Sequence, residues 1–261
     1  MKKASPAVVG ILGFGALAQE LVASLRSQAI SWVALVRDPQ KYAVGGNIRL
    51  VTGLDDLLSA RPAAVVELAG HQAVAAHVPA LLDAGIPVIL ASVGALTDDA
   101  IMAKLADARA RSGAGLVIPS GAVGGLDYVK AVSTLPDVKI GYTSRKPPAA
   151  WRDELAARNL DASVSEVVLF DGAPDEAARR YPKNLNAAFT IAQAAWPARL
   201  NVRVVADPLA EGNTHEIVID SAAGRASMRF VNAPSPTNPK SSMVTALSIA
   251  ASLRDYLADP S

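Results

Sequence analysis

The sequence contains no cysteine and only three histidines. Without cysteine the chain cannot form disulfides, use a thiol nucleophile or bind a metal through thiolates, and this composition fits a cytoplasmic protein. The histidines His71, His77 and His215 show neither HxxxH nor HExxH spacing. We therefore expect no metal site built on histidine.

Strong net charge and long apolar runs are also missing. The formal net charge is +1, and no basic tract stands out, which argues against a nucleic-acid partner. No apolar run reaches the roughly 18 residues of a transmembrane helix, so we expect no membrane span. The N-terminal string MKKASPAVVG has two lysines but leads directly into a motif-bearing strand. We therefore expect no cleaved signal peptide.

The most informative motif is the N-terminal string VVGILGFGALA. It reads as a strand, a glycine turn and a helix, and it is the dinucleotide-binding fingerprint with Ala18 as its third small residue. Gly13 permits the tight turn and Gly15 lets the backbone approach a pyrophosphate. The helix that follows, beginning with Ala16 and Leu17, presents its positive end to the phosphates. A ligand-free glycine turn is the alternative.

Regular alternation of strand-like and helix-like segments over the first 118 residues predicts βαβ units. Such units form a Rossmann-type, doubly wound parallel sheet. The high hydrophobic content, 51% of 261 residues, is typical of a sheet buried on both faces. We expect strands at residues 8–12, 32–36, 64–68, 87–90 and 116–118, and helices at 16–25, 55–58, 74–84 and 97–111.

The pattern changes after the glycine-rich string SGAVGG at residues 120–125. Strands then follow one another with few helices between them, which predicts a second, α+β domain built on a mostly antiparallel sheet. We expect strands at 138–144, 166–171, 200–206, 214–221 and 226–231, and helices at 174–181 and 185–195. Residues 222–225 fit a hairpin loop. The proline-rich stretch 232–240 fits a linker, and a last helix is expected at 241–258.

These patterns divide the chain into two domains. The first is a dinucleotide-binding domain at residues 1–119, completed by the C-terminal helical segment 240–261. The second is a catalytic α+β domain at residues 120–239. In proteins of this build the substrate lies in the cleft between the two domains, although the fold alone does not fix the reaction.

Two positions in the first domain bear on the cofactor. NAD-specific proteins usually place a carboxylate at the end of the second strand, where this chain has Arg37. Arg37 either pairs with the 2′-phosphate of NADP, which should then be tolerated or preferred, or projects into solvent. Ala69 and Gly70 follow the strand at the edge where the nicotinamide half normally lies. His71, next to them, is either a polar contact in the cleft or a helix-entry residue.

The second domain offers fewer candidates. The Ser120 hydroxyl and the backbone near Ala122 could face the nicotinamide or a substrate carboxylate, or could form a simple turn. His215 starts a strand after a Gly-Asn turn, where a lone histidine is more often structural than catalytic. A catalytic role for His215 is nevertheless favoured, because the chain has few other acid–base groups and imidazole titrates nearest neutrality.

Seven strings along the chain together resemble the L-aspartate dehydrogenase family. They are GILGFGALA, VVELAGHQAV, VILASVGALTD, IPSGAVGGLD, YPKNLNAA, GNTHEIVI and TNPKSSMVTALS, and they occur in order over almost the whole length. The resemblance implies NAD(P)-dependent oxidative deamination of L-aspartate through iminoaspartate to oxaloacetate and ammonia. It also implies a homodimer whose second domain dimerises, and a role in supplying iminoaspartate for NAD biosynthesis.

The same resemblance assigns the site residues. It makes His215 the catalytic residue, with Ala122 and an asparagine of the KNLN string contacting the cofactor; Asn186 is favoured and Asn184 is close behind. The chain departs from the family at Leu68, where a cysteine is often found. An apolar replacement should preserve packing against the nicotinamide.

The implied chemistry needs a base and two anion partners. Hydride leaves Cα of aspartate for the nicotinamide, and water then attacks the imine carbon with the help of a base, for which His215 is the candidate. Both substrate carboxylates need cationic or amide partners. Lys183, Lys240 and Ser120 are the candidates.

Two other functions compete with this interpretation. A related reductase of the dihydrodipicolinate or homoserine type shares the two-domain build, but the first of these families carries paired histidines and this chain has none. Aldehyde dehydrogenases that act on semialdehydes are excluded, because they need a cysteine nucleophile and this chain has no cysteine. A non-catalytic NAD(H)-binding redox sensor would not need His215 or the YPKNLNAA string, and would usually carry a partner-binding extension.

Overall fold

The computed structural model describes residues 6–181, 186–238 and 241–259. The chain divides into two compact units. Unit 1 comprises residues 1–119 and 246–261, and unit 2 comprises residues 120–245.

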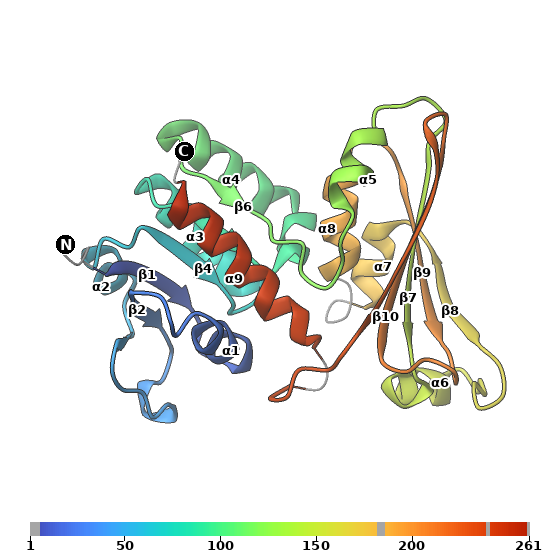
Figure 1. The fold of residues 1–261 in the computed structure, drawn as a ribbon, viewed down its shortest axis with the longest axis horizontal. Helices are drawn as coiled ribbons and strands as arrows, with labels where there is room; N and C mark the ends of the chain where they lie inside the picture. The colour runs from blue at the N-terminus through green and yellow to red at the C-terminus, as the bar shows by residue number, and fades with distance from the viewer. Residues whose placement is uncertain (1–5, 182–185, 239–240, 260–261) are drawn as a thin grey trace. The chain divides into compact units, whose positions relative to one another are not determined.

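Unit 1 is built on a six-stranded sheet in the order β3-β2-β1-β4-β5-β6, with every neighbouring pair parallel (Figure 1). The strands are β1 (Ala7–Leu12), β2 (Ile30–Leu35), β3 (Ile48–Val51), β4 (Ala64–Glu67), β5 (Val88–Leu90) and β6 (Leu116–Val117). The strand order reverses between β1 and β4, and ligands of open α/β sheets bind at such a switch point, at the carboxyl ends of the strands. The predicted doubly wound sheet is therefore confirmed.

Helices cover both faces of this sheet, as parallel sheets require. They are α1 (Ala16–Ser24), α2 (Leu54–Ser59), α3 (His71–Asp83), α4 (Asp99–Ser112) and α9 (Met243–Ala258), with the 3-10 turns η1 (Pro39–Lys41) and η2 (Val93–Thr97). Ile249 and Leu253 of α9 pack in one apolar cluster with Leu21 of α1 and Trp32 of β2. The last helix therefore belongs to the core of unit 1.

Unit 2 contains a five-stranded sheet in the order β11-β10-β7-β9-β8. Its strands are β7 (Lys139–Lys146), β8 (Val167–Gly172), β9 (Leu200–Ala206), β10 (Asn213–Ser221) and β11 (Gly224–Asn232). The pair β7–β9 is parallel and the other three pairs are antiparallel. The predicted mostly antiparallel α+β architecture is confirmed.

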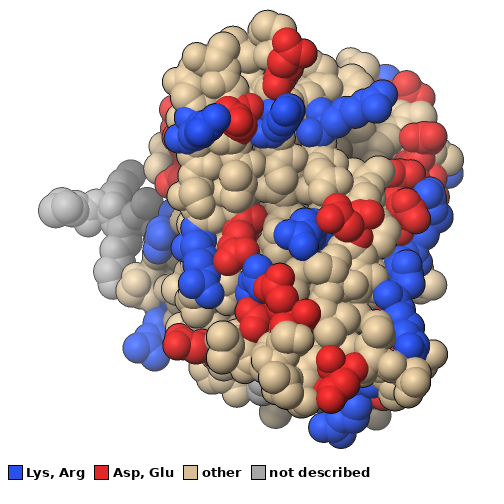
Figure 2. Space-filling model, turned by 90° about the vertical axis from the view of Figure 1, so that its right-hand side faces the viewer, with Lys and Arg blue, Asp and Glu red and all other residues tan. Residues whose placement is uncertain are grey.

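Helices lie on one face of the unit 2 sheet (Figure 1). These are α5 (Leu126–Val132), α7 (Pro174–Arg180) and α8 (Asn186–Ala195), while η3 (Pro148–Trp151) and α6 (Arg152–Ala157) follow β7. The opposite face carries ion pairs, and Figure 2 shows acidic and basic side chains interspersed across it. Arg145 lies there, paired with Glu166, Asp207 and Glu216.

The sequence did not predict β3, α5 or α6. In β3 only Val51 is buried, and Arg49 is exposed, so this edge strand lacks the apolar run that marks its neighbours. Helices α5 and α6 have seven and six residues, which is too short for a clear helical period. Among the residues that the structure describes, no helix could cross a membrane.

Candidate active site

The two glycines of the first turn are required for different reasons. Gly13 has φ +81°, and a Cβ added there would lie 2.9 Å from the Cβ of Ala69. Gly15 has φ −75°, is exposed, and has no atom within 4 Å of an added Cβ. The protein itself therefore requires glycine at position 13, whereas the space beside Gly15 is open to a ligand.

This open space lies at the N-terminus of α1. Gly15 is the N-cap residue and makes no side-chain capping bond, so the first amides of the helix, which include Ala16 and Leu17, are available to an anion. Both of these residues are half-buried. The loop fits the pyrophosphate of a dinucleotide, and hydrogen-bonding amides at a helix N-terminus are the usual donors for it.

Arg37 follows β2 and is exposed, and its side chain has no ion-pair partner among the described residues. The neighbouring Asp38 accepts a hydrogen bond from the Gln40 amide at 3.1 Å and pairs with Lys41 at 3.7 Å. A cavity of about 420 Å³ beside the glycine loop is lined in part by Lys41 and Tyr42. The charged group left available at this strand end is therefore the cation, not the carboxylate.

Ala69, Gly70 and His71 join the carboxyl end of β4 to α3. Gly70 has φ +102° and ψ 173°, a backbone region open essentially to glycine alone. Ala69 is exposed, and His71, the first residue of α3, is half-buried. Because Ala69 lies against Gly13, the structure brings these residues together with the glycine loop at one edge of the sheet.

In unit 2 the segment after residue 119 lies against the β10–β11 hairpin. The carbonyl of Ala122 accepts a hydrogen bond from the Asn232 side chain at 2.8 Å. A Cβ added at Gly124 would lie 3.2 Å from the ring of Phe230, which is the cross-strand neighbour of His215. Ser120 is half-buried. The junction thus contacts β11, the strand that pairs with the strand of His215.

His215 is buried on the helix-covered face of β10. Its Nδ1 lies 2.7 Å from the hydroxyl oxygen of Tyr142 on β7, and the two rings are nearly parallel. Its Nε2 is buried and has no hydrogen-bond partner among the described residues. Buried polar atoms are nearly always satisfied, so Nε2 is the ring atom left for a ligand or a water.

Lys146 lies four residues after Tyr142 on β7 and therefore shares this face of the sheet with it. Its Nζ lies 5.4 Å from the ring centre of Trp151. Burial, together with the charge of Lys146, lowers the pKa of His215 from 6.5 to about 4. Burial also lowers the pKa of Lys146 and raises that of Tyr142. At neutral pH, His215 is therefore an uncharged imidazole and Tyr142 an undissociated phenol.

Sequence reasoning gave Tyr142 and Lys146 no role. The available signal was the string YTSRK at the end of β7, where alternate residues place polar groups on the core side of the strand. A buried polar side chain on a sheet face that should be apolar calls for a partner. The partner, His215, is 73 residues away from Tyr142.

Four other predicted residues are less informative. Asn186 is the exposed first residue of α8, and its carbonyl accepts a hydrogen bond from the Thr190 hydroxyl at 3.1 Å. Lys183, Asn184 and Lys240 lie outside the described residues. Within the described ranges, no group of three or more His, Asp or Glu side chains could hold a metal ion.

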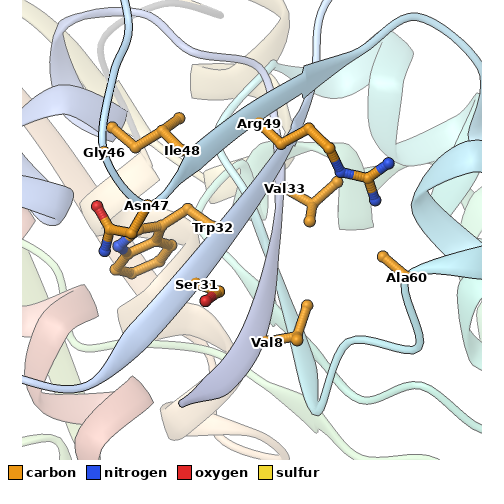
Figure 3. A pocket seen from close by; sticks show the side chains of 9 residues that line it. All are labelled: Val8, Ser31, Trp32, Val33, Gly46, Asn47, Ile48, Arg49 and Ala60. Carbon is orange, nitrogen blue, oxygen red and sulfur yellow. The ribbon is translucent and has the colours of Figure 1, made fainter.

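A cavity of about 390 Å³ lies within unit 1 (Figure 3). Its lining includes Val8, Ser31 and Ile48, near the amino ends of β1, β2 and β3. Ligands of doubly wound sheets bind at the opposite, carboxyl edge. We therefore do not assign this cavity to the cofactor or the substrate.

The chain has a fingerprint loop at the switch point of a parallel sheet, and its α+β unit holds a buried neutral histidine. These features are those of the class of two-domain NAD(P)-dependent dehydrogenases. Comparisons with known proteins agree. The family model described as "Homoserine dehydrogenase, NAD binding domain" matches residues 13–119. The model described as "Aspartate dehydrogenase, C-terminal" matches residues 127–256.

Whole-length relatives narrow the class. The chain is 43% identical to L-aspartate dehydrogenase 2 of Bordetella pertussis, covering 96% of this chain and 97% of that one. It is 37% identical to L-aspartate dehydrogenase of Ruegeria pomeroyi, covering 94% and 91%. The solved aspartate dehydrogenase of Thermotoga maritima is 26% identical, with a TM-score of 0.76 over 95% of this chain and 96% of that one. The chain belongs to the L-aspartate dehydrogenase family.

A dihydrodipicolinate reductase from Paenisporosarcina is a more distant structural neighbour. It is 13% identical, with a TM-score of 0.54 over 94% of this chain and 95% of that one. This likeness shows a shared fold and says nothing about a shared reaction.

Proposed function

We propose that the protein catalyses the NAD(P)-dependent oxidative deamination of L-aspartate, through iminoaspartate, to oxaloacetate and ammonia, and the reverse reaction. The observation that carries the proposal is the environment of His215. Its Nδ1 is held by Tyr142, its Nε2 is left without a partner, and the cation of Lys146 is near. Hydrolysis of an imine needs such a base, and binding of an anionic amino acid needs such a cation.

The cofactor would be held by residues of unit 1. The open space at Gly15 and the α1 amides suit the pyrophosphate, and Arg37 suits the 2′-phosphate of NADP. The segment containing Ala69, Gly70 and His71 would face the nicotinamide half. When bound, the dinucleotide supplies the acceptor for the hydride that leaves the substrate Cα. The cofactor is NAD or NADP.

His215 would serve as the base for hydrolysis of the imine. Hydrolysis requires that a water lose a proton as its oxygen bonds to the imine carbon, and a neutral imidazole can accept that proton. The Tyr142 hydrogen bond occupies Nδ1 and fixes the ring, so Nε2 is the atom that would meet the water. A carboxylate of the substrate would offset the charge of Lys146, the smaller cause of the low pKa of His215, and so raise that pKa and strengthen the base, while the larger effect of burial would persist.

Lys146 is our candidate for binding a substrate carboxylate. It lies on the sheet face of His215, and its charge already acts on that ring. The adjacent Arg145 is less suited because it points to the other face and is paired with three carboxylates. Ser120 remains a second candidate, since its segment contacts β11, the strand that pairs with the strand of His215. Lys183 and Lys240 stay predictions from the sequence.

Ala122 and Asn186 are proposed as cofactor contacts on the family resemblance, with Asn184 as the alternative. A homodimer, a cytoplasmic location and a contribution to NAD biosynthesis belong to the same proposal. The homodimer and the contribution to NAD biosynthesis rest on family membership. The cytoplasmic location is compatible with the absence of cysteine.

The decisive assay follows oxidation of NADH or NADPH with oxaloacetate, with and without ammonium. An aspartate dehydrogenase consumes the reduced cofactor only when ammonium is present, and aspartate accumulates in proportion. Consumption that ignores ammonium would identify a plain keto-acid reductase and refute the proposal. Glutamate-forming activity from 2-oxoglutarate serves as the control for substrate class.

A further inference from the structure

Glu67 is a charged residue in a position where charge is costly. It ends β4, whose sequence is otherwise the apolar run Ala-Val-Val, and it is completely buried. Burying a carboxylate is strongly unfavourable unless hydrogen bonds replace its water. The side chain takes no part in the roles proposed above, so its presence needs an explanation.

The Glu67 carboxylate is surrounded by donors. Oε1 accepts hydrogen bonds from the amides of Ala69 and Gly70, both at 2.8 Å, and from the Ser92 hydroxyl at 3.1 Å. Oε2 accepts a hydrogen bond from the Ser92 amide at 2.9 Å. Because an ionised carboxylate only accepts hydrogen bonds, this arrangement matches it on both oxygens.

These bonds join two loops that are distant in sequence. Ala69 and Gly70 follow β4, whereas Ser92 follows β5 and begins the η2 turn. A third loop is included by contact, because Ala69 lies against Gly13 after β1. All three loops lie at the carboxyl edge of the sheet, next to the switch point between β1 and β4.

We propose that Glu67 is a positioning residue for dinucleotide binding, whose carboxylate holds the loops after β4 and β5 in the arrangement that receives the nicotinamide half. In a doubly wound sheet, the loops after the second set of strands bind the nicotinamide half of the dinucleotide, and the loops after the first set bind the adenosine half. The backbone amides of Ala69 and Gly70 are turned toward the carboxylate, which determines how the small residues at this edge face the cofactor. The inference concerns cofactor binding and does not depend on aspartate being the substrate.

Glu67→Gln is the matched substitution, since it keeps shape and volume. Both carboxylate oxygens accept an amide N–H, so either placement of the glutamine turns its NH₂ group toward a backbone donor. One loop or the other must then move. We expect the effect to depend on whether the ligand has a nicotinamide ring, which a purely structural role of Glu67 would not produce.

The experiment compares NADH with ADP-ribose, which lacks the nicotinamide, by isothermal titration calorimetry on the full chain. For Glu67→Gln we expect the Kd for NADH to rise at least about tenfold and the Kd for ADP-ribose to stay within about twofold. Leu105→Ala, which removes a buried side chain in the middle of α4, is the control for lost stability. Both of its Kd values should stay within about twofold.

Two results would overturn the inference. One is an unchanged Kd for NADH in folded Glu67→Gln. The other is an equal rise for NADH and ADP-ribose, which would mean general loosening of unit 1. If Glu67→Gln does not fold, Ser92→Ala tests the same point, because it removes one donor and keeps the amide bond. We expect a rise of at least about threefold for NADH alone, and no rise would reject the proposal.

Discussion

Replacing Gly15 with valine should abolish dinucleotide binding and leave the fold intact. The backbone at Gly15 has φ −75° and ψ −169°, which any residue can adopt. Apart from residue 15 and its two chain neighbours, the new Cβ would meet no protein atom within 4 Å, so the stability change should stay within about 1 kcal/mol. The added methyl groups would instead occupy the space in which the backbone approaches a pyrophosphate.

Gly13→Ala provides the opposite result in the same turn. A residue other than glycine at φ +81° lowers the free energy of unfolding by about 1–3 kcal/mol. The new Cβ would also lie 2.9 Å from the Cβ of Ala69, and this overpacking lowers the free energy of unfolding by a further amount of about 1–3 kcal/mol. We therefore expect destabilisation of about 2–6 kcal/mol, a large share of the roughly 5–15 kcal/mol typical of a folded domain.

Urea denaturation and calorimetric titration with NADH distinguish the two variants. Gly15→Val should unfold at nearly the wild-type urea concentration, while its Kd rises at least about 100-fold, equivalent to about 2.7 kcal/mol. Gly13→Ala should unfold at clearly lower urea. Wild-type affinity in Gly15→Val would show that the loop is only a turn, and strong destabilisation of that variant would refute the argument from open space.

Three further predictions concern other residues. His215→Ala should keep the cofactor Kd and lower kcat for aspartate by about 10²–10⁴-fold, because it removes the proposed base; near wild-type turnover would end that role. Since the pKa of His215 is lowered from 6.5 to about 4, the unfolded chain takes up a proton first as pH falls. Stability should therefore drop by about 2 kcal/mol between pH 7 and pH 5, and urea midpoints of His215→Gln should lack this part of the slope. Arg37→Asp should lower the ratio of kcat/KM for NADP over NAD, since a carboxylate repels a 2′-phosphate; an unchanged ratio would place the 2′-phosphate elsewhere.

Local patterns in the sequence were sufficient for much of unit 1. The turn of Gly13 and Gly15, the strand before it and the helix after it form one continuous segment, so their physical roles can be assigned without knowing the rest of the fold. The parallel sheet follows from alternation of apolar strands with helices, because such strands must be covered on both faces. The edge strand β3 was missed because its partial burial leaves no apolar run.

Strand order in unit 2 could not be predicted in the same way. The alternating strands indicated an antiparallel sheet, but β9 inserts between β7 and β8 and runs parallel to β7. That placement depends on how the intervening helices return the chain, which no short pattern encodes. It also decides which side chains share a face with His215.

The sequence by itself determined that this protein has a dinucleotide turn, a doubly wound sheet and a single histidine available in its second half. Only the tertiary structure decided what surrounds the chemistry. Tyr142 meets His215 because β7 pairs with β10 in one register, across 73 residues. Glu67 meets Ser92 because β4 pairs with β5, across 25 residues. Both of these hydrogen bonds join segments brought together by neighbouring strands, so their partners are set by strand pairing and not by spacing along the chain.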